Sequence, residues 1–215
     1  RGIDSNEYPR GFRPDDSWRS AFFKQFPATR DQPLLTLAGR MTRLKGHEDL
    51  LRLLARLRIR GIAAHGLIVG GTDPRKSAYA DEMKALAATL NVSSHVTFTG
   101  HRTDLKQIYA ISEIVFSLSS TPESFGRTVA EALSIGTPVV GYNHGGVAEI
   151  LAAQFPSGAV ETGNLDLLAE TTAAMLNQTP RPVPGPCVFR KETMLRRTLD
   201  LYESVCKSES GIGNN

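Results

Sequence analysis

The stretch from 114 to 141 reads Ile114-Val-Phe-Ser-Leu118, Ser119-Ser-Thr-Pro-Glu123-Ser-Phe-Gly126, Arg127-Thr-Val-Ala-Glu-Ala-Leu-Ser134, Ile135-Gly-Thr137 and Pro138-Val-Val-Gly141. Its two ends are short apolar runs of the kind that form buried strands, and residues 127–134 predict a helix. A helix that joins two strands of one sheet makes a right-handed crossover, so the strands run parallel. The stretch therefore predicts one strand–helix–strand unit of a parallel sheet.

The same alternation of strand-like and helix-like segments runs through most of the chain. Short apolar runs predict strands at 34–38, 66–69, 96–98, 114–118, 138–141 and 159–160. The segments after them predict helices at 48–57, 76–90, 103–110, 127–134, 147–151 and 165–176. Strands that alternate with helices form a parallel sheet covered on both faces. We therefore predict an α/β fold with a doubly wound, Rossmann-like parallel sheet.

The two ends of the chain depart from this alternation. Residues 1–33 hold four prolines, with Trp18, Phe22, Phe23 and Phe26 between them. They predict a linker packed on the domain, with a short helix through Lys24 that Asp16 or Ser17 caps. The aromatic side chains could pack against this sheet or against a further domain. Residues 34–180 form the predicted Rossmann-like domain, followed by a Pro-rich linker at 180–186, a C-terminal helix in 187–206 and a disordered tail at 207–215.

The composition fits one large domain with a mildly basic surface. The chain has 215 residues, 40% of them hydrophobic, with a net charge of +3 and a pI of about 9.0. Its interleaved charges suit an anionic ligand and require no nucleic acid. Cys187 and Cys206 form no disulfide framework, which favours a reducing, cytoplasmic setting. Because the chain begins at Arg1 without Met, we expect it to be a piece of a longer protein.

Ligands of such sheets bind beyond the carboxyl ends of the strands, where helices begin. After the first predicted strand come Gly39, Arg40, Lys45 and Gly46. Two cations beside the backbone N–H groups of a helix start suit a diphosphate, although surface cations with a capping glycine make the same pattern. After the second predicted strand, Gly70-Gly71 either allows close approach of a ligand or forms an ordinary turn.

The loop after the fourth predicted strand carries two carboxylates and a helix start. Gly126 opens the helix, so the N–H groups of Ser124, Phe125 and Gly126 suit a phosphate or sugar oxygen. Glu123 either accepts hydrogen bonds from ligand hydroxyls or acts as a helix-cap acid. Glu131 lies about 8 Å along the helix axis from its start. Glu131 is either a solvated helix residue or a site residue. The second alternative is open because its stretch is otherwise apolar and a carboxylate there needs a partner. At this separation the two carboxylates are no general acid/base pair.

A further helix start follows the fifth predicted strand. Gly145-Gly146 lets backbone donors approach a phosphate, and His144 either orients a ligand or faces solvent. The chain has no Asp-x-Asp pair for a divalent metal, and neither a Gly-x-Gly-x-x-Gly fingerprint nor a Walker loop. We therefore expect ligand binding without a metal or a cofactor, and a dehydrogenase is disfavoured.

Together these residues resemble the retaining glycosyltransferases of family four, which have the GT-B fold of two Rossmann-like domains. The family's most specific motif is a Glu, seven intervening residues and a second Glu followed by Ala, which here is Glu123 to Glu131 with Ala132. Arg127 and Thr128 stand where aliphatic residues are commoner. The other matches, in the expected order and spacing, are Gly39-Arg40, Lys45-Gly46, Gly136-Thr-Pro-Val-Val140, and Gly145-Gly146 with Glu149, within a resemblance that runs from Arg1-Gly-Ile-Asp4 to Tyr202.

The resemblance implies one half of a GT-B fold and a role for each candidate residue. Arg40 and Lys45 would bind the donor diphosphate and stabilise the leaving phosphate, which helps to deprotonate the acceptor in a front-face displacement. Glu131 would bind the ribose hydroxyls, and the loop at His101 and Arg102 would meet the base. The implied catalytic residues are Arg40, Lys45 and Glu123, and the implied donor-binding residues are Gly39, Gly71, His101, Arg102, Glu123, Ser124, Phe125, Gly126 and Glu131.

The implied partners are a nucleotide-diphosphate sugar and an N-terminal acceptor domain, which this chain lacks. We expect the chain to bind donor weakly and to transfer no sugar alone. The resemblance also implies polysaccharide or lipopolysaccharide biosynthesis, in the cytoplasm or, for a membrane-peripheral full-length protein, at the inner face of the membrane. Two alternatives stay open: a GT-B nucleotide-sugar epimerase or phosphorylase, and a non-catalytic nucleotide-binding module. The sequence identifies neither the sugar, the base nor the acceptor.

Overall fold

A parallel sheet forms the centre of the computed structural model, which describes residues 1–72, 78–180 and 182–210. Within these ranges the strands are hydrogen-bonded in the order β3-β2-β1-β4-β5-β6, and every pairing is parallel. This order is the doubly wound arrangement, so the predicted fold class is confirmed. The strands are β1 Leu34–Ala38, β2 His65–Val69, β3 Val96–Gly100, β4 Ile114–Ser117, β5 Val139–Tyr142 and β6 Ala159–Val160.

The direction of winding reverses between β1 and β4. In the register of these two strands, Leu35 lies beside Ile114 and Leu37 beside Phe116. The chain leaves β1 toward one face of the sheet and leaves β4 toward the other. A crevice therefore opens beyond the carboxyl ends of these two strands, which is where ligands of doubly wound sheets bind.

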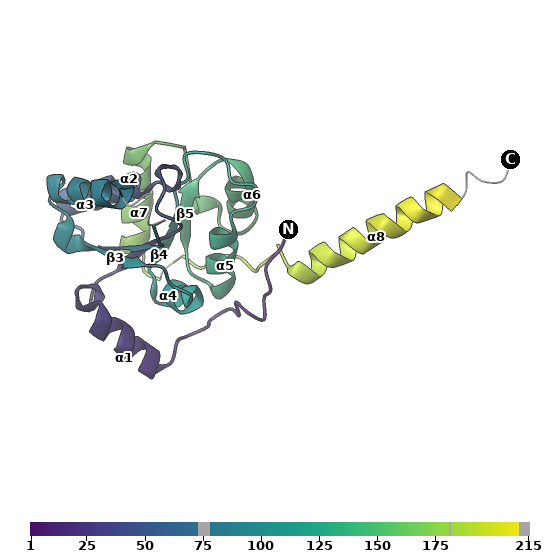
Figure 1. Cartoon of the computed structure of the whole chain (residues 1–215), viewed down its shortest axis with the longest axis horizontal. Coiled ribbons are helices and arrows are strands. Elements are labelled where there is room, and N and C mark those ends of the chain that lie inside the picture. The colour runs from purple at the N-terminus through teal and green to yellow at the C-terminus, as the bar shows by residue number, and fades with distance from the viewer. Residues whose placement is uncertain (73–77, 181, 211–215) are drawn as a thin grey trace.

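Helices cover both faces of the sheet (Figure 1). On one side α2 packs against α3 and α7, and on the other α5 packs against α4 and α6. Both faces of β1 and β2 are buried, as their apolar sequences require in a parallel sheet. The helices that cover them are α2 His47–Ile59, α3 Ala78–Thr89, α4 Leu105–Ile111, α5 Arg127–Ile135, α6 Gly145–Gln154 and α7 Leu165–Asn177.

The N-terminal aromatic residues belong to α1, Asp16–Gln25, which packs on this domain. Phe22 is 2% exposed and forms a cluster with Leu67, Val69 and Ile108. The open question about the aromatic side chains is thereby settled for Phe22, which packs against this sheet. The predicted cap is wrong, because the carboxylate of Asp15 accepts the hydrogen bond from the Trp18 N–H.

The last helix, α8 Lys191–Ser210, points away from the sheet (Figure 1). It is longer than predicted: residues 207–210 are helical and do not start a disordered tail, while residues 211–215 lie outside the described ranges. The Ile3 N–H donates to the Phe189 carbonyl, and the Lys191 N–H to the Ile3 carbonyl, so the two ends of the chain meet before α8 begins. None of the described helices combines the length and the apolar character that a bilayer crossing needs.

Candidate functional site

The loops after β1 and β4 are in direct contact. A short 3₁₀ turn, Arg43–Lys45, leads to Gly46, whose φ of 74° is a left-handed conformation that favours glycine. A Cβ atom at Gly46 would overlap the carbonyl oxygen of Leu118. The Ser120 N–H donates to the Leu44 carbonyl at 2.9 Å. The predicted diphosphate loop and the predicted sugar loop therefore form one unit.

Lys45 and Glu123 meet across this junction. The Lys45 Nζ donates to the Glu123 Oε1 at 2.6 Å, and the two side chains are 31% and 24% exposed. They lie in a cavity of about 450 Å³, lined also by Arg1, Ser124, Phe125, Gly126 and Arg127. The sequence predicted separate roles for Lys45 and Glu123, whereas in the structure their side chains form an ion pair. The pair offers a cation for phosphate oxygens and a carboxylate for hydroxyl groups in the same cavity.

The loop that carries Glu123 rests on the start of α6. The Gly146 N–H donates to the Glu123 carbonyl at 2.7 Å. A Cβ atom at Gly145 would lie 2.7 Å from the same carbonyl oxygen, and one at Gly146 would lie 2.5 Å from the Phe125 Cα. The expectation that these glycines admit a phosphate is therefore corrected: they admit the backbone of the neighbouring loop. His144 is likewise engaged, since its Nε2 lies 2.9 Å from the Ser119 carbonyl oxygen.

The N-terminus of α5 stays open toward the site. Gly126 is its N-cap, in a left-handed conformation, and no side chain caps the first turn. The N–H groups of that turn therefore remain available to an anion. Arg127 and Thr128 are consecutive in this turn, and they line two different cavities. The start of α5 thus forms the boundary between the two halves of the site.

The second cavity, of about 210 Å³, lies at the ends of β1 and β2. Arg40 is exposed, and no ion pair or hydrogen bond of its guanidinium occurs among the described residues. A Cβ atom at Gly39 would lie 3.4 Å from the Lys45 Cδ, so the Gly39 backbone lies between this cavity and the Lys45 side chain of the first cavity. Gly39, Arg40, Gly71, His101 and Arg102, all predicted to bind donor, line this cavity together.

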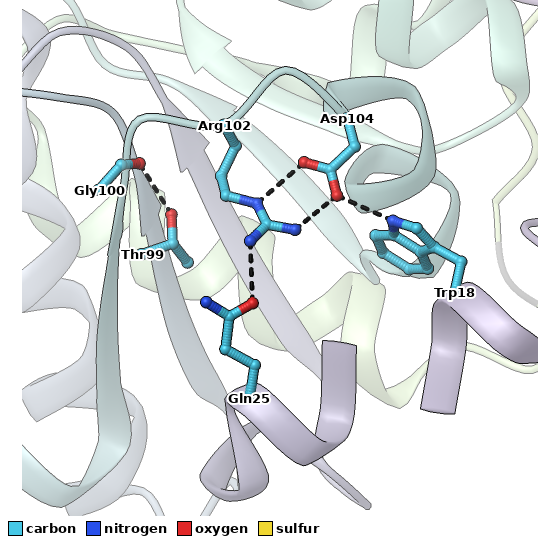
Figure 2. A network of polar contacts seen from close by, with 6 residues as sticks. All are labelled: Trp18, Gln25, Thr99, Gly100, Arg102 and Asp104. Atoms are coloured by element: carbon cyan, nitrogen blue, oxygen red, sulfur yellow. Dashed lines mark hydrogen bonds and ion pairs between the residues drawn. The ribbon is translucent and has the colours of Figure 1, made fainter. Parts of the chain in front are cut away.

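Arg102 is held by α1 and by its own loop (Figure 2). Its Nε and Nη2 donate to the two Asp104 oxygens at 2.9 and 2.6 Å, and its Nη1 donates to Gln25 at 3.0 Å. Trp18 Nε1 also donates to Asp104, at 2.8 Å. Burial alone would raise the pKa of Asp104, but the hydrogen bonds from Arg102 and Trp18 hold it below its usual value. One donor of Arg102 therefore joins the β3–α4 loop to α1, and two bind Asp104 within that loop. No local sequence pattern indicated these contacts.

Glu131 lies under the N-terminal segment. Its side chain is 6% exposed, and its Oε1 is 4.0 Å from the Arg127 Nη1. The Tyr8 hydroxyl lies near its carboxylate, and the Ser134 hydroxyl donates to the Tyr8 carbonyl at 2.7 Å. Burial raises the pKa of Glu131 to about 7, against the opposing effects of Arg127 and Tyr8. The sequence indicated that this carboxylate needs a partner. It did not reveal Tyr8, because 123 residues separate the two in the chain.

The described residues contain no group of three or more His, Cys, Asp or Glu side chains arranged to hold a metal ion. The side chains that gather at the crevice are cations, one half-exposed carboxylate, one buried carboxylate and uncapped helix N–H groups. Such a set binds phosphate and hydroxyl groups. Fold and site together therefore define a doubly wound domain whose switch point offers groups that suit a phosphorylated, hydroxyl-bearing ligand.

Comparison with known proteins names the family. Residues 19–183 match the model of the Glycosyl transferases group 1, and the chain belongs to this family. It is similar to the D-inositol 3-phosphate glycosyltransferase of Mycolicibacterium smegmatis, at 31% identity over 181 residues, which is 83% of this chain but 39% of that protein. The chain thus spans well under half the length of this relative.

Two solved structures share the fold. A glycosyltransferase from Rickettsia africae has a TM-score of 0.82 and 23% identity, over 96% of this chain and 56% of that one. Anabaena HepE, solved in complex with UDP and glucose, has a TM-score of 0.72 and 25% identity, over 83% of this chain and 46% of that one. In both cases the similarity covers about half of a longer molecule.

Proposed function

We propose that this chain is the donor-binding, C-terminal domain of a retaining, metal-independent GT-B glycosyltransferase. In this proposal the full-length enzyme transfers a sugar from a nucleotide-diphosphate sugar that this chain binds, and an N-terminal domain binds the acceptor. The observation that carries the proposal is the Lys45–Glu123 pair, at 2.6 Å, in a cavity at the switch point. Family membership and the UDP and glucose bound by HepE support it.

The two cavities divide the donor between them. The cavity with Lys45, Glu123 and the start of α5 takes the sugar and the phosphate next to it. The cavity with Arg40 and His101 takes the nucleoside and the second phosphate. Gly39 lies against the Lys45 side chain. The diphosphate can therefore extend past Gly39 from one cavity to the other.

The chemistry follows from this placement. The bond between the anomeric carbon and the phosphate oxygen breaks, and the leaving diphosphate gains negative charge beside Lys45 and Arg40. The acceptor hydroxyl attacks from the same face, and its proton passes to a leaving phosphate oxygen, so the configuration is retained. Lys45 must exchange Glu123 for phosphate when the donor binds, which leaves the carboxylate free to accept hydrogen bonds from sugar hydroxyls.

The wider setting is also part of the proposal. We infer that transfer needs the N-terminal domain, so this chain alone binds donor without transferring sugar. Polysaccharide or lipopolysaccharide assembly, in the cytoplasm or at the inner face of the membrane, is the proposed context.

Calorimetric titration of this chain tests the central assignment. UDP, GDP and ADP are each compared with their glucose or mannose conjugates, for the wild type and for Glu123→Ala. We expect the variant to bind nucleoside diphosphate at least as well as the wild type, since Lys45 loses its competing carboxylate, and to lose the extra affinity due to the sugar. Glu170→Ala, an exposed position on α7, is the matched control and should change neither value.

The outcomes separate the alternatives. An unchanged sugar contribution in Glu123→Ala contradicts the role of Glu123. Nucleoside diphosphate binding without any contribution from the sugar, in the wild type, favours a non-catalytic nucleotide-binding module. Conversion of the donor by the full-length protein without an acceptor favours an epimerase.

A further inference from the structure

Tyr109 lines the second cavity and carries a buried hydroxyl group that has no partner among the described residues. It belongs to α4, and its residue is 0% exposed. The Thr137 hydroxyl donates to the Tyr109 carbonyl at 2.8 Å, which holds the backbone in place. The Tyr109 side-chain hydroxyl has no hydrogen-bond partner among the described residues, yet the residue lines the cavity with Arg40 and His101. A buried hydroxyl without a partner is unfavourable and calls for an explanation.

The neighbours of this hydroxyl point to a second polar group close by. Thr128 of α5 lines the same cavity and lies beside the Tyr109 hydroxyl without completing a hydrogen bond to it. Glu131 stands three residues after Thr128, so the two share one face of the helix. Burial and the nearby Glu131 charge both raise the pKa of Tyr109, so the phenol keeps its proton and can donate it. Tyr8 already occupies one side of the Glu131 carboxylate.

We propose that Tyr109 binds the ribose of the nucleotide donor: its hydroxyl donates to the oxygen of the ribose 2′-hydroxyl, whose own proton goes to Glu131. This inference rests on the proposed function and adds a ligand-binding residue to it. A ribose hydroxyl both accepts and donates one hydrogen bond, so it satisfies a phenol and a carboxylate that lie side by side. A 2′-deoxyribose leaves the phenol unpaired. Tyr109 therefore makes the site selective for ribonucleotides.

The test compares ribonucleotides with their 2′-deoxy counterparts in calorimetric titrations of this chain. The probes are UDP with 2′-deoxy-UDP and GDP with 2′-deoxy-GDP. The wild type should bind the ribonucleotide more tightly, and Tyr109→Phe should reduce that preference by about threefold to tenfold, the value of one hydrogen bond. Binding of the 2′-deoxy nucleotide should change little.

Thermal unfolding separates a ligand-binding role from a structural one. Because the hydroxyl has no partner among the described residues, Tyr109→Phe without nucleotide should unfold at the wild-type temperature or above it. Tyr142→Phe is the matched control: it removes the hydroxyl of another buried tyrosine, which donates to the Asp49 Oδ2 at 2.6 Å. This control should unfold at a lower temperature and keep the full preference for ribonucleotides.

Three results overturn the inference, and the third of them overturns the proposed function as well. If Tyr109→Phe binds nucleotide with an unchanged ribose preference, Tyr109 does not contact the ribose. If Tyr109→Phe unfolds at a clearly lower temperature without nucleotide, the hydroxyl has a structural partner. If the wild type binds no nucleoside diphosphate at all, the proposed function itself fails, and the inference fails with it.

Discussion

Glu123 and Glu131 lie on either side of the start of α5, and their side chains have different surroundings. Glu123 is 24% exposed and pairs with Lys45 at 2.6 Å. Glu131 is 6% exposed, lies near the Tyr8 hydroxyl, and has its pKa raised by burial to about 7. One carboxylate is paired with a cation that a ligand can take over, and the other is buried among hydroxyl groups. The same residue type therefore stands in two different electrostatic environments, one beside a cation and one largely out of contact with water.

The largest effect is expected when Lys45, the cation that pairs with Glu123, is removed. Lys45→Met in the full-length enzyme should lower kcat for sugar transfer by about a hundredfold to a thousandfold, because the leaving phosphate loses a charged donor. Lys84→Met, at an exposed position on α3, is the control and should leave kcat unchanged. A kcat within threefold of the wild type would show that Lys45 does not act on the transition state.

The next prediction concerns the junction that brings Lys45 to Glu123. Gly46→Ala should lower the free energy of unfolding by about 2–4 kcal/mol, since the added methyl group overlaps the Leu118 carbonyl and φ is 74°. Gly61→Ala has a similar φ of 70° but nothing within 4 Å, so it should show only the backbone cost of about 1–2 kcal/mol. Urea unfolding of both variants measures the difference, and equal losses would contradict the close junction.

The third prediction concerns the pH dependence of stability on the Glu131 side. The folded-state pKa of Glu131 is about 7, above its value of about 4.3 in an unfolded chain. The folded protein therefore binds the proton more tightly, and stability falls as pH rises between these two values. Glu131 faces Tyr8, Glu7, Arg127 and Tyr109.

Glu131→Gln should flatten this part of the pH profile. After allowance for solvent screening, the loss in the wild type between pH 4.5 and 7 should be on the order of 1–2 kcal/mol larger than in the variant. Urea unfolding at half-unit steps of pH measures it. A profile of Glu131→Gln parallel to that of the wild type would rule out the raised pKa.

The smallest effect is expected when the Lys45–Glu123 ion pair is removed and the free energy of unfolding is measured. Glu123→Gln should change the free energy of unfolding by less than about 1 kcal/mol, because both partners keep contact with water. Urea unfolding at neutral pH checks this value, and a loss above 2 kcal/mol would mean that the pair supports the fold. Together with Glu131→Gln, this variant shows whether burial separates the two carboxylates as the structure indicates.

Much of the fold could be predicted from the sequence because each element carries its own signal. The apolar runs at Leu34 and Ile114 and the helical spacing after Gly126 are local patterns, and their alternation implies a parallel sheet. Boundaries were less predictable: α6 begins at Gly145, two residues earlier than expected, and α8 continues through residues 207–210. Helix ends depend on contacts with neighbouring elements as well as on local propensity.

The site was predictable as a set of residues but not as a set of contacts. Gly39, Arg40, Gly71 and His101 do line one cavity, and Lys45 and Glu123 share another. No local pattern revealed that Lys45 pairs with Glu123, since 78 positions separate them in the chain. The same is true of Arg102, which binds Asp104 and α1.

Short-range patterns and the order of strands were enough to predict the doubly wound sheet, the loops at its carboxyl edge and the residue types in those loops. The three-dimensional packing was needed to learn which glycines face backbone, which cation pairs with Glu123, and that Tyr8 and Tyr109 flank Glu131. The physical reason is that burial and pairing depend on segments far apart in the chain. They make Glu123 a partly exposed partner of a lysine, and they make Glu131 a buried group with a pKa of about 7.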